Sequence, residues 1–351
     1  MSSDPHSAPV PDSAWLAGDL ARERGRVEIF NATRPGGLDG WTMHPPRERT
    51  LPMTDLTLPT GDVNLATSLA PFLMLARDPT VRLSPGLFER ATLTPEGPGT
   101  IAVTWDPARP EALVRTHGDG ADWLQRQAPA MLGLLDDVTG FAPTTDPLRT
   151  LWRRHQGDRV TASGTLWHDL AWFIVQQRVT RGEAAASWSQ LVHTLGAPAP
   201  GSADLIVPPA PAVIGRLTYE WLHQFGFERQ RAEILIAAAR FAHRVHQAPW
   251  PDQETTLTAL GMVRGVGPWT RSCLSTFTWG SADTVITGDA GIPSLVTWIH
   301  AGERRGDDER MFQLLEPYRP HRYRVIRLAF ASGSRPPRRA PRTPVNPIRG
   351  R

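Results

Sequence analysis

The sequence of 351 residues predicts an α+β protein made of two modules. Between residue 27 and about residue 104, short apolar segments alternate with loops rich in proline and glycine, which is typical of antiparallel strands. From residue 147 to residue 331, apolar residues recur at the spacing of amphipathic helices, and the connections are short. The change of pattern near residue 146 predicts the boundary between the modules.

Four segments follow from this division of the chain. Residues 1–20, rich in Ser, Pro and Asp, are expected to be a flexible N-terminus, and residues 21–146 an α+β module. Residues 147–331 are expected to be all-helical. Residues 332–351 are predicted to be a disordered Arg/Pro-rich tail, because its prolines cannot sustain a helix.

The first module is expected to contain four recognisable strands and two helices. A proline- and glycine-rich stretch at 94–100 is interpreted as a loop between the last two strands. The predicted strands are Val27–Phe30, Leu51–Leu58, Ala91–Leu93 and Thr100–Trp105, and the predicted helices are Val63–Ala76, with Asp62 as N-cap, and Gly120–Leu134.

The second module is expected to be a set of many short helices. No internal repeat is recognisable in it. The predicted segments lie near 147–155, 166–180, 182–195, 210–225, 228–247, 253–263, 268–279, 290–302, 307–315 and 320–331.

Composition excludes several classes of protein. Cys273 is the only cysteine, so an intramolecular disulfide and a four-cysteine metal or iron–sulfur site are impossible. No apolar run approaches the roughly 20 residues of a membrane helix. The segment Met1–Pro11 lacks the basic and apolar regions of a signal peptide. We therefore expect a cytoplasmic protein that has no contact with a membrane.

All 38 basic side chains are arginine, and lysine is absent. The net charge is only +3, but ten arginines and no acidic residue follow residue 316, which leaves about −7 on the first 316 residues. A basic C-terminal end suits phosphate contact. For residues 335–351 a solvated tail is the preferred interpretation.

The most informative motif is the segment Leu260–Leu274. Gly265 and Gly267 flank a small apolar residue, and Pro268 stands where a first helical position is expected. Glycines permit a sharp turn and leave amide N–H groups accessible, and successive free amides at a helix N-terminus bind anions. A DNA phosphate is the obvious ligand, although the two glycines taken alone favour an ordinary tight turn between two helices, and only their context favours the phosphate site.

Together with its surroundings this motif resembles the helix-hairpin-helix DNA glycosylase superfamily, specifically the 3-methyladenine DNA glycosylase II family. The resemblance extends from about residue 27 to residue 330. The segments that carry it are Gly265–Thr270, Ile286–Ile292, Val175–Thr180, Phe225–Ala232 and Met311–Arg327, with Asp62–Leu65, Asp78–Thr80 and Thr94–Gly97 in the first module. The resemblance implies a TATA-binding-protein-like antiparallel α+β domain followed by an all-α helix-hairpin-helix glycosylase domain.

The resemblance also implies a catalytic residue, Asp289. Breaking an N-glycosidic bond develops oxocarbenium character on the sugar, and a nearby carboxylate stabilises it or activates water. An alkylated purine is already cationic and leaves without a general acid, so one carboxylate suffices. Asp289 also suits the N-cap of the following helix, and both roles are compatible.

The absence of lysine bears on the reaction type. By the resemblance, bifunctional relatives carry a Schiff-base lysine at the position of Trp269. Only an N-terminal amine remains as a substitute, so we expect a monofunctional enzyme that excises the base without nicking the strand.

The resemblance assigns roles to further residues. Trp269 and Phe330 are implied as aromatic walls of the base pocket and Cys273 as a pocket residue where a tyrosine is common; core packing is the alternative for Trp269. Trp172, by contrast, is interpreted as a core residue. Gln176 and Gln177 are expected near the minor groove, where a simple helix end is the alternative. Further DNA contacts are expected from the hairpin residues Gly265, Val266, Gly267 and Thr270 and from Arg322. Arg324 and Arg327 are expected either to contact phosphate or to be solvated surface residues.

These inferences lead to a monofunctional DNA glycosylase that excises alkylated bases, chiefly 3-methyladenine, with 7-methylguanine and hypoxanthine as further candidate substrates. The expected partner is double-stranded DNA with alkylated bases, bound by a nucleoid-associated monomer that needs no protein partner. No cofactor or metal site is expected, apart from a monovalent cation at the hairpin backbone. A non-catalytic DNA-binding protein is the main alternative, because Ala290 and Gly291 depart from the family pattern. An unrelated helical scaffold is a third possibility, and it requires several coincidental matches.

Overall fold

The computed structural model describes residues 55–245 and 252–337. The predicted flexible segment 1–20, the predicted strand Val27–Phe30 and most of the predicted tail lie outside the described residues. Within the described part, a five-stranded antiparallel sheet is combined with many helices, which confirms the predicted α+β class.

The sheet follows the order β1–β5–β4–β3–β2, and every neighbouring pair is antiparallel. Side chains alternate between a buried face and a more exposed face, as on β5, where Ala112 and Val114 are buried. The strands are β1 (Leu56–Pro59), β2 (Val81–Ser84), β3 (Leu87–Thr94), β4 (Gly97–Trp105) and β5 (Glu111–Gly118).

The sheet is more extensive than predicted. The stretch expected to be a loop at 94–100 is a tight turn, because Gly97 adopts a positive φ of 127° and β4 starts there, opposite Thr94. Strands β2 and β5 were not predicted, since arginines and other polar side chains interrupt their short apolar pattern. Both strands gain their stability from pairing and from burial of one face.

The predicted helix Val63–Ala76 is wrong in its extent and its cap. Helix α1 (Leu65–Leu69) is capped by Asn64, whose side chain accepts a hydrogen bond from the Thr67 amide at 3.2 Å. A 3-10 turn, η1 (Ala70–Leu73), follows because Pro71 cannot continue an α-helical ladder. Asp62 instead accepts two hydrogen bonds, at 2.8 and 2.9 Å, from Arg159. Helix α2 (Ala121–Met131) packs along β4 and β5.

The helical part agrees with the predicted elements to within a few residues at most ends. Two differences stand out: the predicted segment 210–225 is two short helices, and a small two-stranded ladder separates α5 from α6. The elements are α3 (Asp146–Arg154), α4 (Leu166–Val175), α5 (Arg181–Leu195), β6 (Ala197–Pro198), β7 (Ile206–Val207), α6 (Pro211–Ile214), α7 (Tyr219–His223), α8 (Arg229–Val245), α9 (Gln253–Leu260), α10 (Pro268–Phe277), α11 (Ile292–Ala301), α12 (Asp308–Leu315), η2 (Glu316–Tyr318) and α13 (Arg322–Ala331).

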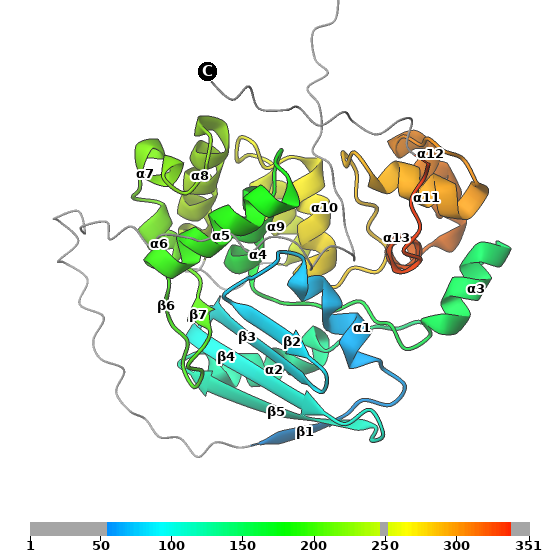
Figure 1. The fold of residues 1–351 in the computed structure, drawn as a ribbon, viewed down its shortest axis with the longest axis horizontal. Coiled ribbons are helices and arrows are strands. Elements are labelled where there is room, and N and C mark those ends of the chain that lie inside the picture. The colour runs from blue at the N-terminus through cyan, green and yellow to red at the C-terminus, as the bar shows by residue number, and fades with distance from the viewer. Residues whose placement is uncertain (1–54, 246–251, 338–351) are drawn as a thin grey trace, which may run out of the picture.

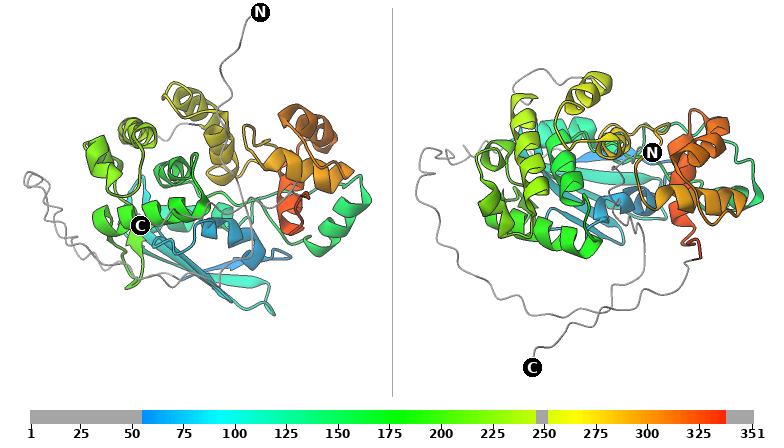
Figure 2. Two further views of the ribbon diagram at one scale, coloured as in Figure 1. Left: turned by 45° about the horizontal axis from the view of Figure 1, so that its top comes forward. Right: turned by 90° about the horizontal axis from the view of Figure 1, so that it is seen from above.

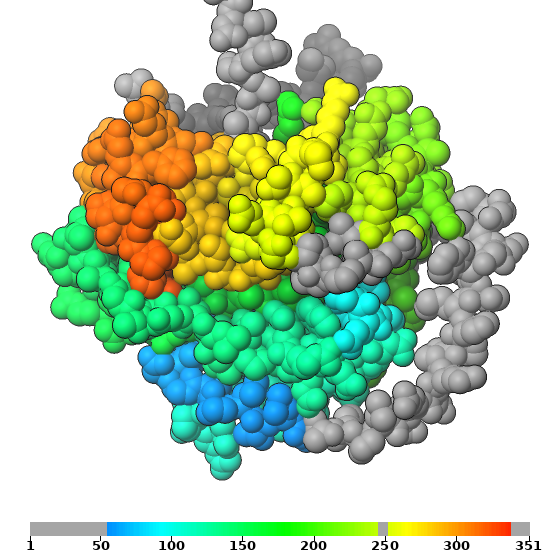
Figure 3. Space-filling view, turned by 180° about the vertical axis from the view of Figure 1, so that it is seen from behind, coloured from blue at the N-terminus to red at the C-terminus, as the bar shows by residue number. Residues whose placement is uncertain are grey.

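The helices form a layer on one side of the sheet. Helix α2 packs along β4 and β5 and α4 contacts β3, while α6–α8 lie at one end of the layer and α11–α13 at the other (Figure 1). Two turned views show the same layering (Figure 2). Seen from behind, the yellow-to-orange C-terminal part lies directly above the green-to-blue part in the view (Figure 3). One hydrophobic core runs through both parts, and Trp172 belongs to it, as predicted.

A buried ion pair crosses the boundary between sheet and helices. Arg90 of β3 donates to Asp169 of α4 at 2.8 Å, and the two side chains are only 3% and 1% exposed. The other carboxylate oxygen of Asp169 accepts hydrogen bonds from Thr278 at 2.7 Å and from Ser163. Asp169 therefore joins β3, α4 and the C-terminal end of α10.

His168 lies beside this pair and is buried. Its ring nitrogens contact Thr92 at 2.9 Å and Thr80 at 3.3 Å, and the ring stacks on Trp188 with centroids 5.6 Å apart. Burial, with a smaller contribution from Arg90, holds the pKa of His168 well below its usual value near 6.5. The folded protein therefore keeps this imidazole neutral.

This burial predicts a loss of stability in mild acid. Below pH 6.5 the unfolded chain binds a proton at His168 that the folded chain does not, so the free energy of unfolding falls by up to about 1.4 kcal/mol per pH unit. Urea unfolding at pH 7.5 and pH 5 measures this slope. His168→Gln should flatten it relative to wild type, whereas His193→Gln, at an exposed position of α5, should not. Equal slopes in all three proteins would contradict the assignment.

Candidate active site and DNA-binding hairpin

Helices α9 and α10 form a hairpin around Gly265. Gly265 has a φ of +88°, and a Cβ atom there would lie 2.3 Å from the side chain of Ile234. Val266 is buried at the turn, and its amide donates to the Val263 carbonyl at 2.9 Å. Sterics therefore require glycine at 265, whereas a Cβ at Gly267 would meet no atom within 4 Å.

The N-terminus of α10 has accessible donors. Gly267 is its N-cap and supplies no side-chain hydrogen bond, and Pro268 starts the helix as predicted. The amides of Gly265 and Gly267 donate to no residue within the described ranges. An uncapped helix N-terminus with free amides is an anion site, so the hairpin geometry suits a phosphate group.

Gln177 is tied to the hairpin. Its amide nitrogen donates to the Gly265 carbonyl at 3.1 Å and to the Thr270 hydroxyl at 2.9 Å. Thr270 is 1% exposed and its hydroxyl holds Gln177, while the DNA contact predicted for this residue stays a prediction. Gln176 donates to the Trp172 carbonyl at 3.0 Å.

Asp289 is 6% exposed and lies immediately before α11. Oδ1 accepts hydrogen bonds from the amides of Gly291 at 2.8 Å and Ile292 at 2.9 Å, while Oδ2 accepts from the Trp269 indole at 2.9 Å. The N-cap of α11 is Gly291 and not Asp289 as the sequence suggested, but Asp289 accepts from two amides at the start of that helix. The same bonds fix the plane and position of the carboxylate.

Trp269 differs from its predicted role as a wall of the base pocket. Its indole N–H is committed to Asp289, and its ring packs edge-on against Phe173, with centroids 6.0 Å apart. The tryptophan thus links the start of α10 to the carboxylate and lies outside the cavity described next.

A cavity of about 310 Å³ opens beside Asp289, within the range of small-molecule sites. Both Cys273 and Phe330 line it, as expected for pocket residues. Ile292, whose amide binds Asp289, is also in the lining. Burial, together with the nearby charge of Asp289, raises the pKa of the Cys273 thiol well above its usual value, so the thiol stays protonated.

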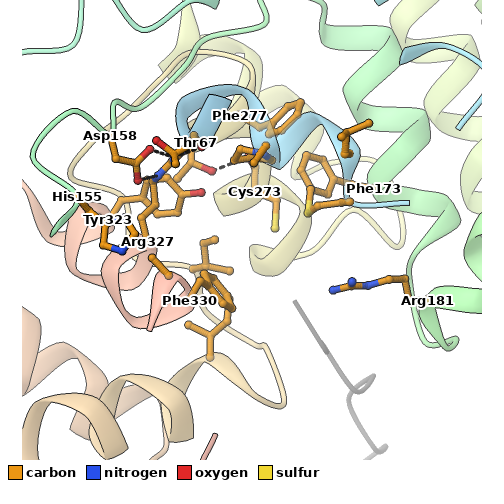
Figure 4. Close-up of a pocket in the computed structure, with 18 residues that line it drawn as sticks. Thr67, His155, Asp158, Phe173, Arg181, Cys273, Phe277, Tyr323, Arg327 and Phe330 are labelled. Carbon is orange, nitrogen blue, oxygen red and sulfur yellow. Dashed lines mark hydrogen bonds and ion pairs between the residues drawn. The ribbon is translucent and has the colours of Figure 1, made fainter. Parts of the chain in front are cut away.

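The cavity also contains residues that the sequence analysis missed. Phe173, Phe277 and Tyr323 contribute aromatic faces, and a polar group that includes Asp158 and Arg327 lies opposite Phe173 and Phe277 (Figure 4). The spacing on α10 could have indicated Phe277, because positions 273 and 277 follow Trp269 at intervals of four and lie on one side of the helix. One wall comes from η1 and the residue after it, Met74, so the sheet module helps to form the site.

The predicted phosphate contact of Arg322 is wrong in this structure. Its guanidinium makes two hydrogen bonds to Asp283, at 2.9 and 2.8 Å, and the residue is 9% exposed. Arg324 is paired in the same way with Asp136. Helix α13 therefore turns its arginines towards acidic partners inside the protein, and neither predicted alternative for them applies.

The described ranges hold neither a metal-binding cluster nor a membrane-spanning helix. There, no group of three or more His, Cys, Asp or Glu side chains is placed to hold a metal ion. No helix described is long and apolar enough to cross a bilayer.

The hairpin, the buried carboxylate and the adjoining aromatic cavity occur together in a fold shared with solved DNA glycosylases. No family model and no curated protein sequence matches the chain. The 3-methyladenine DNA glycosylase from Archaeoglobus fulgidus has a TM-score of 0.66 at 18% identity, over 79% of this chain and 97% of that one.

Two further structures carry the same fold. MBOgg1, solved in complex with a low-affinity DNA ligand, has a TM-score of 0.62 at 17% identity, over 80% of this chain and 95% of its own. An 8-oxoguanine glycosylase/lyase from Clostridium acetobutylicum, in complex with double-stranded DNA, has a TM-score of 0.58 at 10% identity, over 78% and 92%. The chain therefore shares the fold of these solved DNA glycosylases.

The hairpin geometry predicts different tolerance at its two glycines. Gly265→Ala should lower both thermal stability and affinity for duplex DNA, because Cβ would collide with Ile234 and the positive φ is strained. Gly267→Ala should unfold at the wild-type temperature. Thermal unfolding and fluorescence anisotropy with a labelled duplex measure the two effects. Equal loss of stability in both variants would refute this description of the turn.

The bond between Trp269 and Asp289 predicts a kinetic phenotype. Trp269→Phe keeps a large ring but removes the donor to Oδ2, so single-turnover base excision should slow by about 10- to 100-fold, as for loss of a charged hydrogen bond. The dissociation constant for DNA should stay within about twofold, because the hairpin amides are untouched. Trp279→Phe, in the same region but outside the cavity lining, is the matched control. An unchanged excision rate in Trp269→Phe would exclude a positioning role.

Proposed function

We propose that this protein is a monofunctional DNA glycosylase of base excision repair that flips an alkylated base into the cavity and hydrolyses its N-glycosidic bond. The observation that carries the proposal is the position of Asp289. It lies between a helix N-terminus suited to phosphate and an aromatic cavity large enough for a base.

The chemistry assigned to Asp289 follows from its hydrogen bonds. Positive charge develops on the sugar as the glycosidic bond breaks, and a carboxylate held in a fixed orientation stabilises that charge without reorganising. The bonds from Trp269 and Ile292 supply this orientation. We assign Asp289 to stabilising the oxocarbenium-like sugar and to guiding the attacking water.

Four aromatic residues support an alkylated purine as substrate. Phe173, Phe277, Tyr323 and Phe330 offer π faces around the cavity. A cationic base is attracted to such faces by about 0.5–2 kcal/mol per contact, which favours a damaged purine over a normal one. In the proposed complex the base leaves as a neutral molecule, so no general acid is needed.

Strand cleavage is not expected. A Schiff base requires an unprotonated amine, and the chain contains no lysine. The position at which the catalytic lysine would be expected is occupied by Trp269. The similarity in fold to a glycosylase/lyase does not imply strand cleavage, because that reaction depends on the amine and not on the fold. The proposed product is an intact strand with an abasic site.

The remaining expectations belong to the same proposal. They are a TATA-binding-protein-like first domain, a helix-hairpin-helix second domain, double-stranded DNA as the partner, and a nucleoid-associated monomer. A monovalent cation on the hairpin backbone would assist phosphate binding, while Gln176 and Gln177 approach the minor groove. Of the predicted hairpin contacts, Gly265, Val266 and Gly267 are retained through their backbone.

The decisive test is release of free base from methylated DNA. Asp289→Asn keeps the side-chain volume but removes the charge, so we expect a loss of about 100-fold or more in single-turnover rate with DNA affinity retained. Full activity in Asp289→Asn would rule out the mechanism. DNA binding by wild type without any base release would instead favour a non-catalytic damage-recognition protein.

A second assay tests the monofunctional assignment. Wild-type protein incubated with an abasic duplex should leave the strand intact until alkali or an abasic-site nuclease is added. Rapid strand cleavage by the protein alone, trapped by borohydride, would show that the N-terminal amine acts as a nucleophile.

A further inference from the structure

The cavity beside Asp289 has two chemically different ends. At one end Phe173 and Phe277 form an aromatic wall with Arg181 beyond it, and the other end holds a charged pair (Figure 4). The polar end is formed by Asp158, Tyr323 and Arg327, with Thr67 and Thr276 beside them. An apolar cavity needs no charged pair for packing, so the polar end requires its own explanation.

The ion pair at this end is built into the fold. Arg327 Nε donates to Asp158 at 3.2 Å, and Nη2 donates to the same carboxylate and to the Thr67 carbonyl at 3.3 Å. Both charged side chains are 10% exposed. Asp158 holds the guanidinium from one side, and within the described ranges no residue accepts a hydrogen bond from Nη1.

Tyr323 adds a second donor. Burial raises the pKa of its phenol, so the hydroxyl keeps its proton at neutral pH. Thr276 also lines the cavity, and its hydroxyl donates to the Cys273 carbonyl at 2.9 Å. The polar end therefore presents an arginine N–H, which has no acceptor character, next to a tyrosine O–H.

We propose that Arg327 and Tyr323 are specificity-determining residues that hydrogen-bond a carbonyl oxygen of the flipped base. The inference rests on the proposed glycosylase function and specifies which edge of the base is read. A base with a carbonyl, such as 7-methylguanine or hypoxanthine, satisfies both donors. 3-Methyladenine has an amino group and no carbonyl, so it leaves Arg327 Nη1 facing another donor, which costs binding in the transition state.

DNA treated with dimethyl sulfate tests this inference, because one substrate contains both 7-methylguanine and 3-methyladenine. Release of each base is followed by chromatography and corrected for spontaneous loss. Tyr323→Phe keeps the ring and removes the hydroxyl, so release of 7-methylguanine should fall by about 10-fold while release of 3-methyladenine stays within about twofold. Tyr219→Phe, on α7 and outside the cavity lining, should leave both rates unchanged.

A second variant addresses the arginine without leaving Asp158 unpaired. Arg327→Lys retains a cation for the carboxylate but removes the planar guanidinium, so the ratio of 7-methylguanine to 3-methyladenine release should fall in the same direction. Single-turnover excision of hypoxanthine from a defined duplex provides a second carbonyl substrate, and thermal unfolding checks that each variant is folded.

The outcomes separate this inference from the proposed function. Release of 3-methyladenine by wild type, with a base ratio unchanged in both folded variants, would overturn the carbonyl contact and leave the glycosylase proposal standing. Release of 3-methyladenine alone would do the same. Release of neither base by wild type would overturn both proposals.

Discussion

The carboxylate of Asp169 is the constraint on which the arrangement of this molecule depends. It is fully enclosed, and it holds Arg90 of the sheet and Thr278 at the end of α10 at the same time. A buried ion pair contributes little net stability, but removing one partner strands a charge at a cost of about 3–5 kcal/mol. Its role here is geometric, because its hydrogen bonds fix β3, α4 and the end of α10 relative to one another.

That position determines where the cavity lies. Arg90 also stands 4.7 Å over the ring of Phe72, and Phe72 packs at 4.8 Å against Phe277 of α10. The aromatic wall of the site is therefore supported from below by the sheet module. On the other side, α10 begins at the hairpin and presents Trp269 to Asp289. A single ten-residue helix thus connects the phosphate-binding end, the carboxylate and the pocket.

Local sequence signals predicted the α+β class, most helices and the sharp turn at the two hairpin glycines, since these depend on periodicity and turn chemistry. They did not predict β2, β5 or the polar end of the cavity. Asp158 and Arg327 are 169 positions apart, and their pairing arises only from tertiary packing. The misassigned Arg322 has the same cause: nothing near it in the sequence indicates that Asp283 will hold it.

The wall contributed by η1 has a consequence for how lesion range changes over time. Ala70, Leu73 and Met74, in η1 and directly after it, line the cavity and are not among the residues that bond Asp289 or the hairpin glycines. Substitutions in this one turn of the sheet module alter the shape available to a base and leave the bond-breaking apparatus intact. Lesion choice can therefore evolve through substitutions in this turn, which is distant in sequence from the residues assigned to catalysis.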